Sequence, residues 1–144
     1  MDEKCAFLNG DLTEDIYMQQ PQGFSTNPSL VCRLNKSLYG LKQAPRAWYA
    51  KIDGFLLSLN FVQCESNTNV YLKLIHGYFI IIVLYVDDLL ITRSSKDEIA
   101  SLKDAMNHAF SMTDLGLLSQ FLGLKIAQTK HGIKFISPSM LWIF

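Results

Sequence analysis

The sequence lacks an excess of charge of either sign. Its 144 residues carry 13 Lys and Arg against 13 Asp and Glu. A stand-alone nucleic-acid-binding domain usually carries a basic excess that neutralises phosphates, so this balance argues weakly against that class. A segment of a larger nucleic-acid-binding protein could still be neutral if the basic surface lay in other segments.

Cysteine is scarce and long apolar runs are absent. Cys5, Cys32 and Cys64 are odd in number and have no metal-site spacing, which indicates buried or free thiols in a reducing compartment. No apolar run follows Met1, so the sequence predicts no secretory signal. The longest apolar run, Tyr78–Val86, is about half the length of a membrane span, so no membrane partner is expected.

The residues that are present suit one packed domain. The chain is 49% hydrophobic and 12% aromatic, and it shows no repeat, low-complexity tract or linker. Helical spacing of apolar residues predicts one helix from Pro45 to Asn60 and a second helix that follows a cap at Ser94 and Ser95. The apolar positions are Trp48, Ile52, Phe55, Leu56 and Leu59 in the first helix and Ile99, Leu102, Met106 and Phe110 in the second.

Runs of branched and aromatic residues predict short strands. Val70–Leu74 and Tyr78–Tyr85 flank His76 and Gly77, a pair typical of a hairpin turn. The order of elements predicts an α+β fold in which an antiparallel sheet is backed by two helices. The other expected strands are Ile16–Gln19, Leu30–Leu34, Leu89–Thr92, Phe121–Ile126 and Ile133–Ile136, the last two joined by a turn near His131 and Gly132.

Two adjacent carboxylates, Asp87 and Asp88, lie between strongly apolar strands. Like charges repel, and burial of either acid without a partner is costly, so a divalent cation such as Mg²⁺ would resolve the conflict. Metal ions held by carboxylates are used for in-line phosphoryl displacement. Two Asp residues between strands are equally typical of a plain hairpin turn, and these residues alone do not exclude that alternative.

A metal site would need a third acidic residue that folding brings to this doublet. The sequence by itself offers Asp2, Asp11, Glu14 and Asp15, and composition does not choose among them.

Four blocks of sequence follow one another along the chain: Asp2–Leu12 with Ile16–Phe24, Val31–Leu34 with Ser37–Tyr49, Leu84–Ile91, and Met112–Gly116 with Phe121–Ile126. Together these blocks resemble the reverse transcriptases of copia-type retrotransposons. The second and third blocks are highly specific as a pair, because neither a turn nor a helix start requires such strings.

The resemblance implies a polymerase centre. Asp2, Asp87 and Asp88 match the family's catalytic, metal-binding aspartates, which implies two Mg²⁺ ions, with Mn²⁺ as an alternative. The implied partners are an RNA or DNA template-primer, deoxynucleoside triphosphates and the rest of a retrotransposon polyprotein. The implied location is intracellular, either in a cytoplasmic virus-like particle or in the nucleus.

Other positions receive roles from the same resemblance. Phe7 matches the floor of the sugar pocket, although a core aromatic is the commoner role of phenylalanine. Gly40 and Gln43 match the segment under the incoming nucleotide. Lys42 and Arg46 could meet phosphates or could be a solvated helix start. Phe121 and Gly123 fall in a hairpin that resembles the element that grips the primer end, with a simple edge hairpin as the alternative.

The chain departs from the family in three places. Glu3 and Cys5 stand where a small branched residue and a threonine are usual, and Glu3 is expected to add charge beside the metal site. Residues 137–144 form a divergent tail. Residues 1–144 are expected to be a truncated palm without fingers or thumb, which leaves open whether the isolated chain is an active enzyme, a degenerate non-catalytic remnant, or a small binding domain in which Asp87 and Asp88 only make a turn.

Overall fold

A computed structural model describes residues 1–25, 27–92, 96–129 and 132–136. Two compact units divide the chain, Met1–Thr113 and Asp114–Phe144. The predicted helix cap at Ser94 and Ser95, the turn residue His131 and the divergent tail 137–144 lie outside the described residues.

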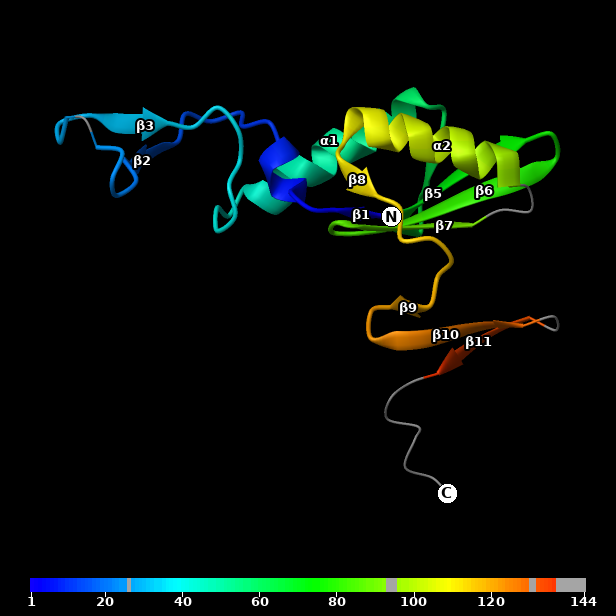
Figure 1. The fold of residues 1–144 in the computed structure, drawn as a ribbon. Coiled ribbons are helices and arrows are strands. Elements are labelled where there is room, and N and C mark those ends of the chain that lie inside the picture. The colour runs from blue at the N-terminus through cyan, green and yellow to red at the C-terminus, as the bar shows by residue number, and fades with distance from the viewer. Residues whose placement is uncertain (26, 93–95, 130–131, 137–144) are drawn as a thin grey trace, which may run out of the picture. The chain divides into compact units, whose positions relative to one another are not determined.

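The first unit is built on a six-stranded sheet with the order β4-β5-β6-β7-β1-β8, in which every pairing is antiparallel (Figure 1). The expected hairpin and the strand after the acidic doublet are confirmed. Strands β1, β4 and β8 were not predicted, because two or three residues are too few to display an alternating pattern. The bounds are β1 Asp2–Glu3, β4 Val62–Cys64, β5 Asn67–Ile75, β6 Tyr78–Tyr85, β7 Asp88–Thr92 and β8 Met112–Thr113.

One face of this sheet is buried and the other is open. In β6, Ile80, Ile82 and Leu84 are buried, whereas Phe79 and Tyr85 are more than two-fifths exposed. Side chains alternate between the two faces of a strand, so the even-numbered residues of β6 face the core.

Helix α1 (Ala44–Ser58) packs on the buried face through Trp48, Ile52 and Leu56. It begins one residue before Pro45, which stands in the first turn. It ends at Ser58, two residues before the predicted stop at Asn60, and Asn60 adopts a positive φ of 61°. The Phe61 amide then donates to the Leu56 carbonyl at 3.1 Å, which closes the helix end in the usual left-handed manner.

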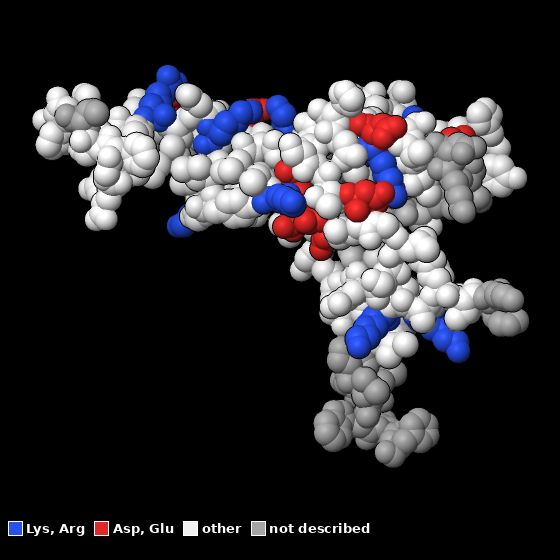
Figure 2. Space-filling view, in the orientation of Figure 1, with Lys and Arg blue, Asp and Glu red and all other residues white. Residues whose placement is uncertain are grey.

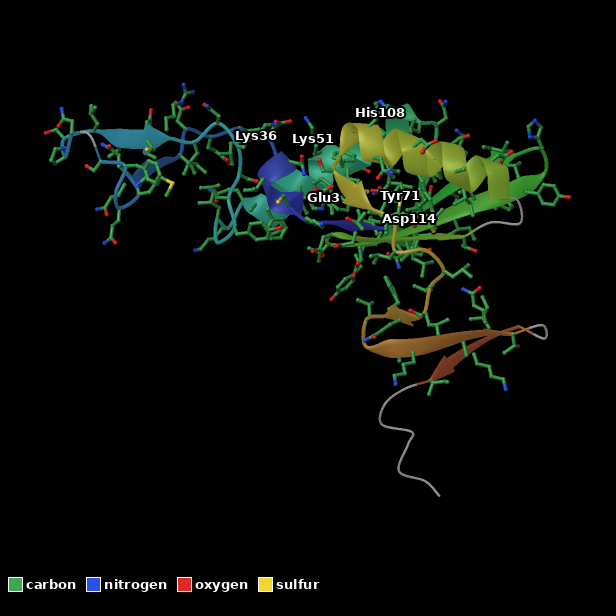
Figure 3. The ribbon with its side chains drawn as sticks, in the orientation of Figure 1. Glu3, Lys36, Lys51, Tyr71, His108 and Asp114 are labelled. Carbon is green, nitrogen blue, oxygen red and sulfur yellow. The ribbon has the colours of Figure 1, made fainter. Side chains whose placement is uncertain are left out.

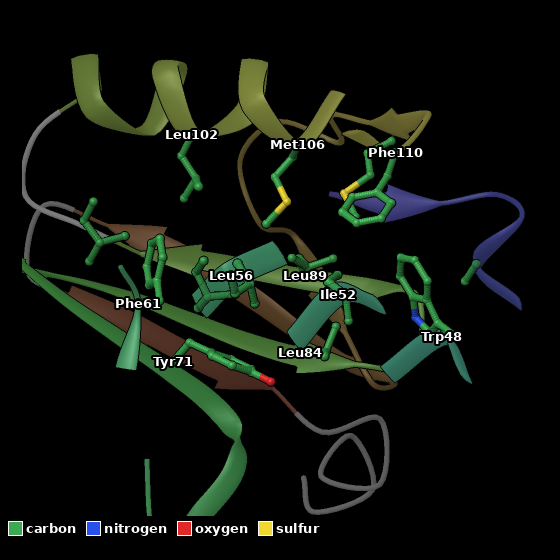
Figure 4. Packing of buried hydrophobic residues seen from close by; sticks show 14 residues of the cluster. Trp48, Ile52, Leu56, Phe61, Tyr71, Leu84, Leu89, Leu102, Met106 and Phe110 are labelled. Carbon is green, nitrogen blue, oxygen red and sulfur yellow. The ribbon is translucent and has the colours of Figure 1, made fainter. Parts of the chain in front are cut away.

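Helix α2 (Lys96–Ala109) covers the same face and confirms the second predicted helix. Its residues Leu102 and Met106, with Phe110 just beyond its end, join residues of α1 and of the sheet in one apolar cluster (Figure 4). The first unit is therefore an α+β structure in which an antiparallel sheet is backed by two helices, as the sequence predicts. Neither described helix is long and apolar enough to cross a membrane.

The remaining strands form two small sheets. β2 (Tyr17–Gln19) and β3 (Val31–Arg33) pair with each other, and the second unit contains β9 (Gln120–Phe121), β10 (Leu124–Thr129) and β11 (Gly132–Ile136). The prediction of one continuous strand over Phe121–Ile126 was wrong. Leu122 and Gly123 have φ values of 49° and 79°, so they make a tight turn between β9 and β10.

Candidate active site

Folding brings the N-terminal acid to the acidic doublet. β1 lies between β7 and β8, and Asp2 is directly opposite Asp88 in the register. The Glu3 amide donates to the Asp87 carbonyl at 3.1 Å, and the Leu89 amide donates to the Met1 carbonyl at 2.8 Å. Figure 2 shows acidic side chains gathered at this end of the sheet. The carboxylate of Asp2 and the distant doublet of Asp87 and Asp88 therefore lie at the same end of neighbouring strands.

The other candidate acids for this group lie elsewhere and most are paired. Asp11 contacts Lys36 at 2.5 Å and Lys51 at 2.6 Å, two side chains that Figure 3 labels beside the N-terminal 3-10 helix η1 (Ala6–Asn9). Hydrogen bonds from these lysines lower the pKa of the Asp11 carboxyl. Asp15 pairs with Arg33 at 2.5 Å. Glu14 is exposed, and only Asp2 pairs with the doublet.

Asp88 lies in an unfavourable electrostatic environment. The pKa of Asp88 is raised by burial and, to a lesser degree, by the charges of Asp87 and Asp2. Like charges directly opposite one another destabilise a strand pair. A hard divalent cation prefers carboxylate oxygens and would remove this repulsion, so the kinds of residue present fit Mg²⁺.

The fit concerns the identity and placement of the residues rather than a preformed cage. Within the described residues, no three His, Cys, Asp or Glu side chains are arranged so that they could hold a metal ion. The side chains of Asp2, Asp87 and Asp88 would have to rotate toward a common point to bind one.

Glu3 does not face this site, contrary to the expectation that it adds charge beside the metal. Adjacent residues of a strand point to opposite faces, so Asp2 is on the open face and Glu3 is on the core face, opposite the buried Met112. Glu3 is only 1% exposed. Its Oε1 accepts long hydrogen bonds from the Cys5 amide and the Asn9 side chain, and its Oε2 has no partner among the described residues.

The acidic doublet does occupy a hairpin, as the turn alternative predicts. Tyr85 pairs with Asp88, which leaves Val86 and Asp87 as the two turn residues. Val86 has a φ of 55°, which is rare for a β-branched residue. Such strained conformations cluster at functional sites. A turn that only connected two strands would not need this strain.

A mainly apolar cavity of about 360 Å³ lies beside the turn. Phe7 lines it, and the Phe7 ring also contacts the Tyr39 ring with centroids 4.8 Å apart. Phe7 is partly buried against the core, so it serves as a core aromatic and as a cavity wall at once. The other lining residues are Pro45, Trp48, Tyr49, Asn69, Leu84, Tyr85 and Val86.

Sequence reasoning missed the role of Trp48 in this region. Its indole Nε1 donates to the Val86 carbonyl at 2.6 Å. From the sequence, Trp48 was placed only among the apolar residues of a helix face. The signal that could have pointed to the hydrogen bond is the indole N–H, because a buried tryptophan usually has a partner for it.

The segment before α1 presents its predicted residues to solvent. Gly40 has a φ of 93°, and a Cβ at this position would meet nothing within 4 Å, so the backbone is approachable there. Gln43 is half-buried at the residue that precedes α1. Lys42 and Arg46 are exposed and make no ion pair with the described part of the chain.

Phe121 and Gly123 belong to the second unit. Phe121 ends β9 and Gly123 is the second residue of the β9–β10 turn. The two residues that were predicted to act together on a primer therefore lie at the same tight turn.

The fold defines a class of α+β domain in which Asp2 pairs with Asp88 beside Asp87. The sequence profile described as "Reverse transcriptase (RNA-dependent DNA polymerase)" matches residues 1–141. The chain therefore belongs to this reverse transcriptase family. No solved structure is significantly similar to it.

Retrotransposon proteins from plants and yeast are similar to the chain. It is 50% identical over 137 residues to the retrovirus-related Pol polyprotein from transposon TNT 1-94 of Nicotiana tabacum, covering 93% of this chain and 10% of that polyprotein. It is 39% identical to the corresponding polyprotein from transposon RE1 of Arabidopsis thaliana, covering 92% and 9%. It is also 39% identical to the putative transposon Ty5-1 protein of Saccharomyces cerevisiae, covering 92% and 44%.

The chain spans about a tenth of the length of the plant polyproteins that it matches. It is a reverse transcriptase domain segment of the retrotransposon Pol type.

Proposed function

We propose that the chain is the palm-like part of an RNA-directed DNA polymerase, in which Asp2, Asp87 and Asp88 hold two Mg²⁺ ions, or Mn²⁺ in their place. The observation that carries the proposal is the direct pairing of Asp2 with Asp88 beside Asp87. A hairpin that served only as a turn would not need a third carboxylate from the N-terminal strand. Family membership supports the same role.

The reaction is attack by a primer 3′-hydroxyl on the α-phosphate of a deoxynucleoside triphosphate, on an RNA or DNA template, with no covalent enzyme intermediate. Bound divalent cations would activate that hydroxyl and stabilise the leaving oxygens. The three aspartates place negative charge at one end of strands β1 and β7. Positioning of the reactants is the remaining contribution of the protein.

The neighbouring residues fit supporting roles. Phe7 lines the cavity beside the turn, where a bulky ring would exclude a ribose 2′-hydroxyl. The open backbone at Gly40 and the adjacent Gln43 would lie under the nucleotide, and the exposed Lys42 and Arg46 would contact phosphates.

The second unit is proposed to act on the primer. The β9–β10 turn, with Phe121 and Gly123, would contact the primer strand. The rest of a retrotransposon polyprotein would supply further parts of the polymerase, in a cytoplasmic particle or in the nucleus.

Primer extension on an RNA template tests the proposal, with the chain inside a complete polymerase. Asp88→Asn should lower extension by at least about a hundredfold, the order of loss expected when one electrostatic group is removed at a transition state. Asp11→Asn is the matched control, because Asp11 is an exposed aspartate paired with lysines, and it should extend normally. Near-normal turnover of Asp88→Asn contradicts the assignment.

The alternative of a non-catalytic remnant can be tested at Glu3. Glu3 buries a carboxylate oxygen without a partner in the described structure, which is a cost that a working core rarely carries. The parent chain and a Glu3→Val variant are each placed within the complete polymerase. If both fold and neither extends a primer, the chain is a non-catalytic remnant.

A further inference from the structure

Trp48 makes a contact that neither its helix nor the sheet requires. The side chain is 2% exposed, and its Nε1, which is its one polar atom, donates to the Val86 carbonyl at 2.6 Å. A buried indole N–H needs an acceptor, and here the acceptor belongs to the turn that carries Asp87. The hydrogen bond therefore ties helix α1 to the acidic turn.

The bonded residue is the strained one. Val86 adopts a φ of 55°, a conformation that persists only when the surroundings hold it in place. The next residue, Asp87, accepts a hydrogen bond from the Glu3 amide through its carbonyl at 3.1 Å. A continuous path thus runs from Trp48 through Val86 and Asp87 to β1, which carries Asp2.

The indole is itself fixed from behind. The Phe110 ring meets it edge-on, with centroids 5.2 Å apart and an interplanar angle of 84°. Phe110, the residue that follows α2, also meets Phe55 of α1 edge-on at 5.1 Å, so the ring that packs on the donor is itself held in position. Trp48 donates to a backbone carbonyl and to no carboxylate, so it does not take part in the chemistry directly.

We propose that Trp48 is a positioning residue whose indole N–H holds the Val86–Asp87 turn in register with β1, so that Asp2, Asp87 and Asp88 can bind a divalent cation together. The inference rests on the proposed function for the cation, but the hold on the turn can be measured without it.

The test replaces the N–H without changing the shape of the ring. The β-(3-benzothienyl)alanine residue, introduced at position 48 by codon suppression, has sulfur in place of the N–H group. Two quantities are measured in the whole chain: the hydrogen-exchange rate of the Glu3 amide relative to core amides of β6, and the affinity for Mn²⁺ followed by electron paramagnetic resonance.

Loss of the hydrogen bond should raise the relative exchange rate of the Glu3 amide about fivefold, the effect of one ordinary hydrogen bond. The Mn²⁺ affinity should fall by a similar factor, because the binding-competent turn is less populated. Trp48→Phe, which also lacks the donor, should show the same two changes. Leu102→Ala, in the same apolar core beside Phe61 and Ile80, is the packing control and should speed exchange of Glu3 and of β6 together, with unchanged Mn²⁺ affinity.

The outcomes separate the inference from the proposed function. An unchanged Glu3 exchange rate in the benzothienyl variant overturns the inference, and so does a raised rate with unaltered Mn²⁺ affinity. A parent chain that binds no Mn²⁺ contradicts the proposed function, while the exchange rate still decides whether Trp48 holds the turn.

Discussion

A two-residue turn precedes strand β6 and another follows it, and the two turns differ in their residues. His76 and Gly77 join β5 to β6 with φ values of 49° and 81°. Val86 and Asp87 join β6 to β7, and the positive φ of 55° falls on a β-branched residue. The first turn uses residues that tolerate its geometry, of which glycine is the best suited, whereas the second does not.

The difference extends beyond the backbone. At the His76 turn, the side chain makes an exposed contact of 3.4 Å with Glu98, a kind of pair that contributes little to stability. At the Val86 turn, two carboxylates oppose each other and a buried indole holds a carbonyl. A turn that breaks the local rules that its counterpart obeys is expected where strain serves function, which supports the proposed site at Val86 and Asp87.

The largest expected effect is on catalysis. Asp87→Asn in the complete polymerase should lower primer extension by at least about a hundredfold, because it removes a charge that the proposed cations need. His76→Asn changes the equivalent region at the other end of β6 and should leave extension within about twofold of the parent, since a surface pair contributes little. Equal losses in the two variants would remove the functional contrast between the turns.

The buried Glu3 should give the next largest effect, on folding. Glu3→Val replaces a carboxylate with an unpartnered oxygen by an apolar side chain, and the free energy of unfolding should rise by about 1 to 3 kcal/mol. Urea unfolding followed by circular dichroism measures it.

Lys73→Met provides the comparison at the other end of the sheet. Lys73 donates to the Leu59 carbonyl at 2.7 Å and lies over the Phe61 ring, so its polar head has partners. Its replacement should give no comparable gain. A Glu3→Val protein that is no more stable than the parent would show that Glu3 is satisfied in solution.

Two substitutions in the turns should change the free energy of unfolding in opposite directions and by smaller amounts. Val86→Gly relieves the strain at a positive φ, and the free energy of unfolding should rise by about 1 kcal/mol. Gly77→Val places a β-branched residue at a φ of 81° and should lower it by about 1 to 2 kcal/mol. Thermal unfolding of the two variants checks the signs, and a loss of stability in Val86→Gly would show that the turn is not strained.

The smallest effect is a pH dependence of stability without metal. The pKa of Asp88 is raised in the folded chain by burial and by Asp87 and Asp2, with the Met1 amino group acting in the opposite direction. Its contribution to stability is therefore present below the unfolded-state pKa and is lost as the pH rises through the higher folded value. Relative to the parent, Asp88→Asn should gain stability as the pH rises from about 4 to 7, the range above the ordinary aspartate pKa.

Asp11 is the control of opposite sign. Its pKa is lowered by Lys36 and Lys51, so its contribution is present above the unfolded-state pKa and lost as the pH falls through the folded one. Asp11→Asn should therefore lose stability relative to the parent as the pH rises from about 2 to 4, the range below the ordinary aspartate pKa. Urea midpoints at several pH values compare the two variants, and parallel curves for both would contradict the assigned environments.

Much of this architecture could be predicted from local patterns, and the site could be predicted only in part. Helix α1 was predicted because its buried residues repeat every four positions and Asn60 suits the left-handed stop. Composition could not favour Asp2 over Asp11 as the third acid. Asp2 meets Asp88 through strand β1, and a strand of two residues leaves no pattern in the sequence. The resemblance supplied that choice, and the register now places Asp2 opposite Asp88.

The misjudged features have a common cause. The face of Glu3 and the acceptor of Trp48 depend on which distant strand lies alongside, and no short window of sequence contains that information. The same is true of the turn at Leu122 and Gly123. The sequence there shows a run without a clear break, and the turn is recognised from the positive φ values of the two residues.

A titration of the isotopically labelled chain with Mn²⁺, followed by nuclear magnetic resonance, tests the cation site most directly. We expect paramagnetic broadening confined to the amides around Asp2, Asp87 and Asp88, with His76 and Gly77 unaffected, and we expect Asp88→Asn to abolish it. Equal broadening at both ends of β6, or none near Asp2, would contradict the account.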